Sequence, residues 1–327
     1  MTKFLNAPAD ALTESLEGFA LAHAGEVRLN AAPRYVRRAH PNRAKVALIA
    51  GGGSGHEPLH AGFVGAGMLD AAVPGEVFTS PAPDQIIAAA DAVSGDAGAL
   101  FIVKNYSGDV MNFELAMELH AGASRRVLVE DDVAVDAPGV GRRGVAGTLV
   151  VEKIVGAAAE RGADLDACAA LGDAVAAATR SMGVALGGCR VPTSDRPNLE
   201  LAPGEMEIGV GIHGEPGLRR AAAASAAAVI DEIGGHVLDD LGAARGEPVL
   251  LFVNGFGGTP LMELYILHRE ACRLLADRGL VVARALVGNY VTSLEMPGAS
   301  VTVTRLGDRF AELWDAPVRT PALRWGA

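Results

Sequence analysis

The chain has 327 residues, half of them hydrophobic, and a formal net charge of -11 at pH 7. A chain of this length is expected to form two domains rather than one small one. Its acidic balance, with scattered arginines and no basic run, argues against nucleic-acid binding, which depends on basic contacts to phosphates.

The N-terminal stretch 1–26 places Asp10, Glu14 and Glu17 among its apolar positions, which is typical of an amphipathic helix and not of a signal peptide. No run of about 20 apolar residues is present to cross a membrane. Three widely spaced cysteines form no C-x-x-C pair, so neither a disulfide framework nor a structural zinc site is expected. We therefore expect a soluble, cytoplasmic protein that does not bind a membrane.

Short β-rich apolar runs alternate with alanine-rich segments along the chain. This alternation predicts an α/β protein of two α/β domains, each with a mixed or mostly parallel sheet flanked by helices. The turn-rich segment 187–205 suggests domains at 1–184 and 185–327. The predicted strands are 45–50, 98–104, 125–130, 206–212, 248–254 and 279–287. The predicted helices are 81–94, 110–122, 147–162, 166–182, 216–233 and 260–278.

Glycine-rich loops follow four of the predicted strands: "GGGSGHEP" at 51–58, "NYSGD" at 105–109, "GIHGEPG" at 211–217 and "NGFGGTP" at 254–260. In open α/β sheets, ligands bind at the carboxyl ends of the strands. The four loops therefore predict one composite pocket.

The segment "GGGSGHEPLH" at 51–60 admits three functional interpretations: a phosphate-binding glycine loop, a zinc-protease H-E-x-x-H motif, or a pocket wall that ends in a reactive histidine. A flexible connector is the purely structural alternative. None of the four lysines lies in a G-K-[ST] motif, which excludes a nucleotide P-loop of that type.

The zinc motif requires His56 and His60 on one face of a continuous helix. Pro58 between them would disrupt a helix interior, but proline is favoured at a first helical position. We therefore expect a helix to begin at Pro58, with His56 in the preceding loop and His60 as a packed or solvated helix residue. This placement favours His56 as a proton-transfer group at the edge of the sheet.

Asp109 occupies the expected N-cap of the helix after Lys104, so capping is its simplest role. His213 is less easily explained by structure alone. Glycines on both sides remove neighbouring side chains and would expose its imidazole at a strand end, although a tight turn is an alternative. A neutral imidazole is a nitrogen nucleophile that can add to a ketone.

Six segments in order resemble the K subunit of dihydroxyacetone kinases over nearly the whole chain. They are "GGGSGHEP", "KNYSGDVMNFE", "GRRGVAGT", "EMEIGVGIHGEPG", "VNGFGGTPLMELY" and "DAPVRTPALRW". The resemblance implies a homodimer that holds a short-chain ketose in a cleft. It implies that His213 forms a covalent hemiaminal with the substrate carbonyl and that His56 and Asp109 activate the hydroxyl. Gly53, Ser54, Gly55 and Lys104 would line the substrate site.

The resemblance also implies that no cofactor or metal binds to this chain and that ADP or ATP with Mg is held by a separate L subunit. A phosphohistidine protein is a possible phosphoryl donor acting through that subunit. The sequence ends after "TPALRWGA" without a nucleotide module, which agrees with this expectation. Two alternatives stay open: a paralogue that senses dihydroxyacetone as a transcriptional coactivator, and a kinase subunit for a tetrulose such as erythrulose.

Overall fold

The computed structural model describes residues 3–137 and 140–326, which fold around two six-stranded sheets. The first sheet contains, in spatial order, β1 (Val27–Ala31), β2 (Arg34–Arg38), β4 (Ala71–Val77), β3 (Ala47–Ser54), β5 (Ala99–Lys104) and β6 (Ser124–Val129). The strands from β4 to β6 are parallel, whereas β1 and β2 add an antiparallel edge. The first sheet is therefore mixed, as predicted.

The second sheet is mostly antiparallel. It contains, in spatial order, β11 (Arg219–Ala222), β10 (Glu205–Ile208), β9 (Thr179–Ala185), β14 (Gly298–Arg305), β12 (Pro248–Gly255) and β13 (Val281–Gly288). Only β12 and β13 run parallel to each other. Two short ribbons, β7 (Asp136–Ala137) with β8 (Gly141–Arg142) and β15 (Val318–Arg319) with β16 (Arg324–Trp325), lie outside the two sheets.

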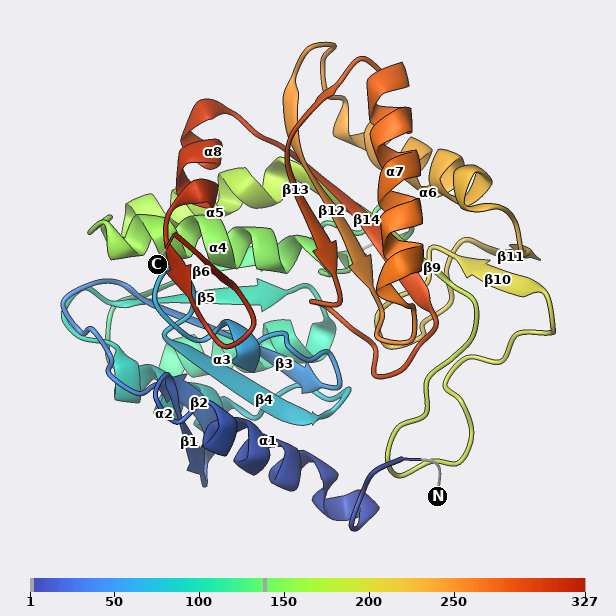
Figure 1. The fold of residues 1–327 in the computed structure, drawn as a ribbon. Coiled ribbons are helices and arrows are strands. Elements are labelled where there is room, and N and C mark those ends of the chain that lie inside the picture. Colours follow the sequence, from blue (N-terminus) through green and yellow to red (C-terminus); the bar gives the residue numbers. More distant parts are fainter. Residues whose placement is uncertain (1–2, 138–139, 327) are drawn as a thin grey trace.

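Helices cover both faces of the first sheet and the outer face of the second. On one face of the first sheet lie α2 (Pro83–Val93) and α3 (Ser107–Leu119). Figure 1 shows α4 (Gly147–Glu160) and α5 (Leu165–Ala177) between the first sheet and the C-terminal half of the chain. The second sheet is covered by α6 (Ala226–Leu241) and α7 (Leu261–Asp277). This layered architecture confirms the predicted fold class.

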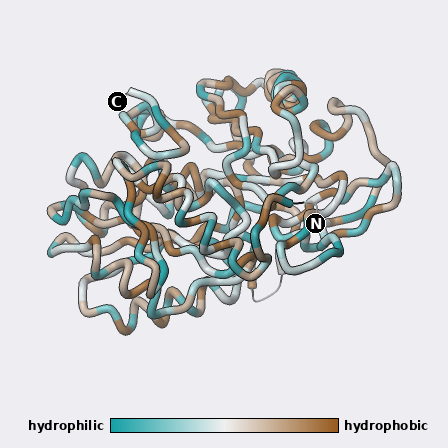
Figure 2. Tube along the Cα trace, turned by 60° about the horizontal axis from the view of Figure 1, so that its bottom comes forward, coloured by the Kyte–Doolittle hydropathy of each residue, from teal (hydrophilic) through white to brown (hydrophobic). Residues whose placement is uncertain are grey.

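One hydrophobic core joins the two halves of the molecule. It includes Leu48 and Ile102 of the first sheet, Ile154 of α4 and Phe252 of the second sheet, all fully buried. Figure 2 shows hydrophobic and hydrophilic residues interleaved along the trace in both halves. The central elements are buried on nearly every face: all of β5 and all of α4 except Glu160 are buried.

The terminal segments pack against the first half. An amphipathic helix, α1 (Ala11–Ala22), is present where the N-terminal pattern predicts it. At the other end, α8 (Asp308–Asp315) packs on α4, and Lys153 of α4 donates to the Leu313 carbonyl at 2.8 Å. The chain changes sheets between α5 and β9, and its C-terminus then returns to the first half. The division at 184 and 185 stays a prediction.

Two local expectations were wrong. No α-helix begins at Pro58; residues 57–60 form turns, and only a short 3-10 helix follows at Ala61–Phe63. The helix predicted over 216–233 begins only at Ala226, because the preceding residues pair with β10 as strand β11. Pairing with the preceding strand thus overrides the helical preference of the alanine-rich segment.

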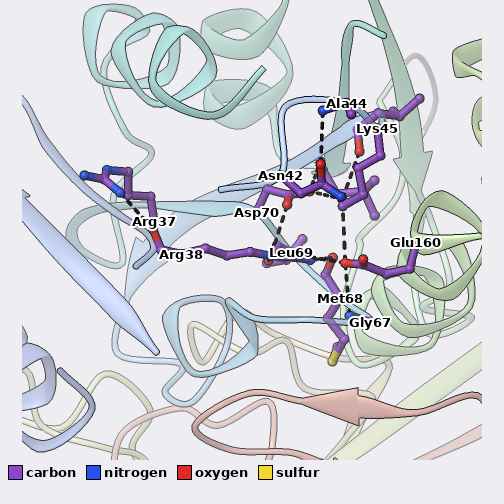
Figure 3. A network of polar contacts seen from close by, with 12 residues as sticks. Arg37, Arg38, Asn42, Ala44, Lys45, Gly67, Met68, Leu69, Asp70 and Glu160 are labelled. Carbon is purple, nitrogen blue, oxygen red and sulfur yellow. Dashed lines mark hydrogen bonds and ion pairs between the residues drawn. The ribbon is translucent and has the colours of Figure 1, made fainter. Parts of the chain in front are cut away.

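A buried ion network connects the first sheet to α4 (Figure 3). Asp70 lies 2.5 Å from the Lys45 ammonium and 3.0 Å from Arg38 Nε, and Arg38 also binds Glu160 at 2.6 Å. Burial alone would raise the pKa of Glu160, but the charges of Arg38 and Lys45 hold it below its usual value. Each charge in the network is therefore offset by an opposite one.

Among residues 3–137 and 140–326, no helix is both long enough and apolar enough to span a membrane. Cys168 and Cys189 are buried and Cys272 is half-buried, each as a free thiol.

Candidate functional site

His213 lies in the loop that follows β10, and Glu215 holds its ring. Its Nδ1 is 2.8 Å from Glu215 Oε1, and its backbone N–H donates to Oε2 at 2.9 Å. Because a carboxylate only accepts, Nδ1 carries a proton. A Cβ at Gly211 would approach Oε2 to 2.0 Å, so the preceding glycine makes room for this carboxylate. The arrangement directs the Nε2 atom of His213 away from Glu215.

The electrostatic surroundings keep the Glu215 carboxyl ionised. Burial alone would raise its pKa, but the hydrogen bond and charge of His213, together with Arg143, lower it to about 2. Arg143 comes from the "GRRGVAGT" segment and also donates to the Gly209 carbonyl at 2.7 Å and to Asp132 at 2.8 Å. Arg143 thereby fixes the loop that carries His213.

His56 follows β3 and is fully buried. Its Nδ1 donates to the Thr292 carbonyl at 2.7 Å, and its Nε2 lies 3.0 Å from Nε2 of His213. Burial lowers the pKa of His56 well below its usual value, and the charges of His213 and Lys104 lower it further. The two predicted histidines, 157 positions apart, therefore face each other directly.

The loop at 254–260 supports this pair indirectly. Asn254 donates to the Val291 carbonyl at 2.7 Å and accepts from the backbone N–H of Tyr290 and Val291. These bonds hold the segment that presents the Thr292 carbonyl to His56. Three of the four predicted glycine loops thus contribute side chains to the candidate site, and the fourth supports it.

Lys104 ends β5 and Asp109 lies in the first turn of α3; both are buried. The Lys104 ammonium is 3.7 Å from Asp109 Oδ2, and Oδ1 has no hydrogen-bond partner among the residues described. The expected N-cap role of Asp109 is wrong, because α3 begins at Ser107 with Tyr106 at its N-cap. A carboxylate in the first turn is still favoured by the helix dipole.

Gly53 and Ser54 end β3, and Gly55 connects them to His56; that these three residues line the substrate site stays a prediction. A Cβ at Gly53 would lie 2.6 Å from the Thr79 nitrogen, and Gly55 has a φ of +103°. These positions therefore require glycine. The Ser54 hydroxyl donates to the Gly75 carbonyl at 2.7 Å. Its buried hydroxyl is thus engaged by the backbone.

Two aromatic rings lie beside the histidines and were not among the predicted site residues, although Tyr106 belongs to the "NYSGD" loop. The Tyr106 ring meets His213 edge to face with centroids 4.7 Å apart, and Phe78 lies 5.3 Å from His213 and 5.2 Å from His56. Burial raises the pKa of Tyr106 well above its usual value. Glu215 also escaped the sequence reasoning, although its position two residues after His213 was a usable signal.

His60 was expected to be a packed or a solvated helix residue. It is packed, but it lies in no helix, and its ring contacts other partners than His56 does. Its ring binds Glu152 and Lys104, whereas His56 binds Thr292 and His213. Within residues 3–137 and 140–326, no three histidine, cysteine or acidic side chains are grouped as metal ligands. A separate cavity of about 450 Å³ lies between α1 and the glycine loop, and His213 is not among its lining residues.

Comparison with known proteins identifies relatives along the full length of the chain. The dihydroxyacetone-binding subunit of the PEP-dependent dihydroxyacetone kinase of Escherichia coli K12 is 45% identical, with both chains covered completely. A D-erythrulose kinase of Mycolicibacterium smegmatis is 41% identical over all of this chain and 57% of its own length.

Solved structures share the whole fold. The dihydroxyacetone kinase of C. freundii superposes with a TM-score of 0.88 at 36% identity, covering 99% of this chain and 60% of that one. A dihydroxyacetone kinase operon co-activator superposes with a TM-score of 0.89 at 33% identity, covering 94% and 97%. The Dak1 domain matches residues 17–322. This chain therefore belongs to the Dak1 domain family.

Proposed function

We propose that this chain binds a short ketose, dihydroxyacetone first among them, and presents its hydroxyl for phosphorylation as the K subunit of a dihydroxyacetone kinase. The observation that carries the proposal is the pairing of His213 with Glu215, which turns Nε2 of the imidazole toward His56. The full-length match to a dihydroxyacetone-binding subunit supports the choice of substrate.

The capture step uses the facing histidines. Both rings donate their Nδ1 protons outward, to Glu215 and to the Thr292 carbonyl. Two lone pairs would repel each other at 3.0 Å, so one proton lies between the Nε2 atoms and one ring is cationic. A ketose that enters between the rings separates them, and its carbonyl oxygen becomes the acceptor for this proton.

The Nε2 lone pair of His213 then attacks the ketose carbonyl carbon. The new C–N bond forms as the C=O π bond breaks, and the carbonyl oxygen takes the proton that the two rings shared. The adduct is an N-alkylated imidazolium whose positive charge replaces that of the protonated pair, so charge and atoms balance. Glu215 is its counter-ion, with a pKa of about 2 that keeps it ionised at neutral pH. Glycerol lacks the carbonyl and cannot form this bond, a discrimination that shape alone would provide only weakly.

The second step needs a base for the hydroxyl that is phosphorylated. Asp109 is buried, its Oδ1 has no hydrogen-bond partner within the described part of the chain, and neutral His56 has an Nε2 lone pair after capture. Together they accept and orient the hydroxyl proton. We place ADP or ATP with Mg on a separate L subunit. There a phosphohistidine protein rephosphorylates the bound ADP, or ATP itself is the phosphoryl donor. We further propose that the chain acts as a homodimer.

Two other functions have specific support. The co-activator structure, 33% identical over most of its length, favours a ketose-sensing role. The D-erythrulose kinase, 41% identical, favours a tetrulose substrate. A sensor needs capture by His213 but no base, so the retention of both His56 and Asp109 favours the enzyme.

The decisive experiment measures phosphorylation of several short ketoses with and without a purified nucleotide-binding L subunit. We expect turnover only with the partner present, and electron density continuous from His213 to dihydroxyacetone, but not to glycerol, in soaked crystals. A van der Waals gap between ring and ketose would contradict covalent capture. Capture without turnover for any ketose would favour the sensor.

A further inference from the structure

His60 and Glu152 are buried titratable groups that the proposed reaction does not use. His60 Nδ1 lies 2.6 Å from Glu152 Oε1, and His60 Nε2 lies 2.8 Å from the Lys104 ammonium. An ammonium only donates, so Nε2 accepts and the ring proton resides on Nδ1, which donates to Glu152. The bonds form a directed chain from Lys104 through His60 to the middle of α4.

This series of hydrogen bonds determines where the Lys104 ammonium lies. Its Nζ donates to His60 and to the Gly51 carbonyl at 3.1 Å, in a space that exists because residue 52 has no side chain. A Cβ at Gly52 would stand 2.3 Å from Nζ. Asp109 Oδ2 is 3.7 Å away, beyond a normal hydrogen bond although the charges are opposite. Lys104 is therefore drawn toward His60 and held at ion-pair distance from Asp109, outside hydrogen-bond range.

We infer that Glu152 and His60 are positioning residues, which tether the Lys104 ammonium apart from Asp109 so that the carboxylate stays open to the substrate hydroxyl. The inference rests on the proposed function, because it assumes that Asp109 acts on a bound ketose. If the tether were cut, the flexible lysine would close onto Asp109 and occupy the acceptor that the reaction needs.

Packing alone does not account for a carboxyl at position 152. The Glu152 side chain is completely buried, and its Oε2 has no hydrogen-bond partner among the residues described. Burial raises its pKa well above the usual value, and only the charge of Lys104 opposes that rise. An uncharged side chain of similar volume would be less costly there. The tether gives this buried acid a function.

The same contacts bear on the charge of Lys104. Burial lowers its pKa, while the negative charges of Asp109 and Glu152 raise it. The groups facing it are Asp109 from α3, Glu152 from α4, and His60 and His56 from the segment after β3. Removal of the charge at Glu152 should therefore make Lys104 lose its proton at lower pH.

The test compares Glu152→Gln with wild type. Glutamine keeps an acceptor for His60 but cannot ionise. With the partner subunit present, we expect turnover to fall by about 10- to 100-fold, the range for a lost charge-assisted hydrogen bond. Ketose affinity from calorimetry should be unchanged, and the alkaline limb of the pH–rate profile should move to lower pH. The matched control is Glu160→Gln on the same helix, in the ion network of Figure 3, which should lower stability without moving the profile.

A second pair of variants tests the same inference if Glu152→Gln does not fold. His60→Leu removes both hydrogen bonds, whereas His60→Gln offers an amide that can accept from Lys104 and donate to Glu152. Turnover should be higher in His60→Gln. Equal turnover in that pair, or wild-type turnover and profile in Glu152→Gln, would overturn the inference and leave the proposed function standing. A wild-type chain that captures no ketose would instead overturn the proposed function.

Discussion

Replacement of the Glu215 carboxylate tests the capture chemistry most directly. The carboxylate accepts the Nδ1 proton of His213 at 2.8 Å and faces the positive charge that the adduct places on the ring. Glu215→Gln keeps one oxygen acceptor of the same reach for Nδ1, removes the charge and gives up the bond that Oε2 accepts from the His213 backbone. The fold should therefore survive while the cationic adduct loses its counter-ion.

The magnitude follows from the two kinds of hydrogen bond. A bond to a charged partner contributes about 1.5–3 kcal/mol and a neutral one about 0.5–1.5 kcal/mol, so the exchange costs about 1–2 kcal/mol. Affinity for dihydroxyacetone should fall about 5- to 30-fold, because each 1.4 kcal/mol is about tenfold. Isothermal titration at constant pH measures this change.

The control is Glu207→Gln, the same substitution in the same region of the fold. Glu207 accepts from the Gly217 backbone at 2.7 Å and does not contact His213 among its recorded hydrogen bonds. Its ketose affinity should match wild type. If Glu215→Gln also binds dihydroxyacetone as tightly as wild type, the adduct does not depend on a counter-ion and the cationic hemiaminal is refuted.

Four further outcomes are expected. Asp109→Asn should retain ketose capture by calorimetry but lose about 10²- to 10⁴-fold in coupled turnover, and near-normal turnover would remove Asp109 as a base. Gly52→Ala should abolish turnover, because its Cβ would meet the Lys104 ammonium at 2.3 Å; Gly18→Ala, with nothing within 4 Å, should be silent. Asp70→Asn should cost about 3–5 kcal/mol in chemical denaturation, because it removes the buried carboxylate that Lys45 and Arg38 share, and a loss under 1 kcal/mol would show that the network contributes little. Because the pKa of Glu215 falls from 4.5 to about 2 in the fold, its stabilisation is complete above pH 4.5 and is lost toward pH 2. The melting temperatures of wild type and Glu215→Gln should therefore converge over that range, and a constant gap would contradict the ionised carboxylate.

Much of the fold could be predicted from local pattern. The six strands expected from apolar runs are all present, and so are the helices near 83–93, 147–160 and 261–277. The sequence analysis missed five strands: β1, β2, β4, β9 and β14. Their segments are short, contain polar residues or are rich in glycine and alanine. Pairing with neighbouring strands makes them strands: β9 pairs with β14, far along the chain, and β1 pairs with β2, which follows it directly. Such pairing leaves little trace in one sequence.

The sequence by itself determined which side chains are available for chemistry. Glycine-rich loops after strands singled out His56, Lys104, Asp109 and His213, because loop positions at strand ends combine a rigid origin with free space. Local pattern also argued against a zinc helix through Pro58, even though the helix expected to begin there is absent.

Only the tertiary structure decided how these groups act on one another. The Nε2 contact between His56 and His213 joins the two halves of the molecule, and the Thr292 carbonyl that orients His56 comes from 236 positions away. The bond from His60 to Glu152 spans 92 positions. Such contacts depend on how sheets and helices stack around a common core. The tautomer and charge of each histidine follow from these contacts. Residue type and spacing specify a side chain's chemistry, whereas its protonation and partners are set by the neighbours that folding brings within 3 Å.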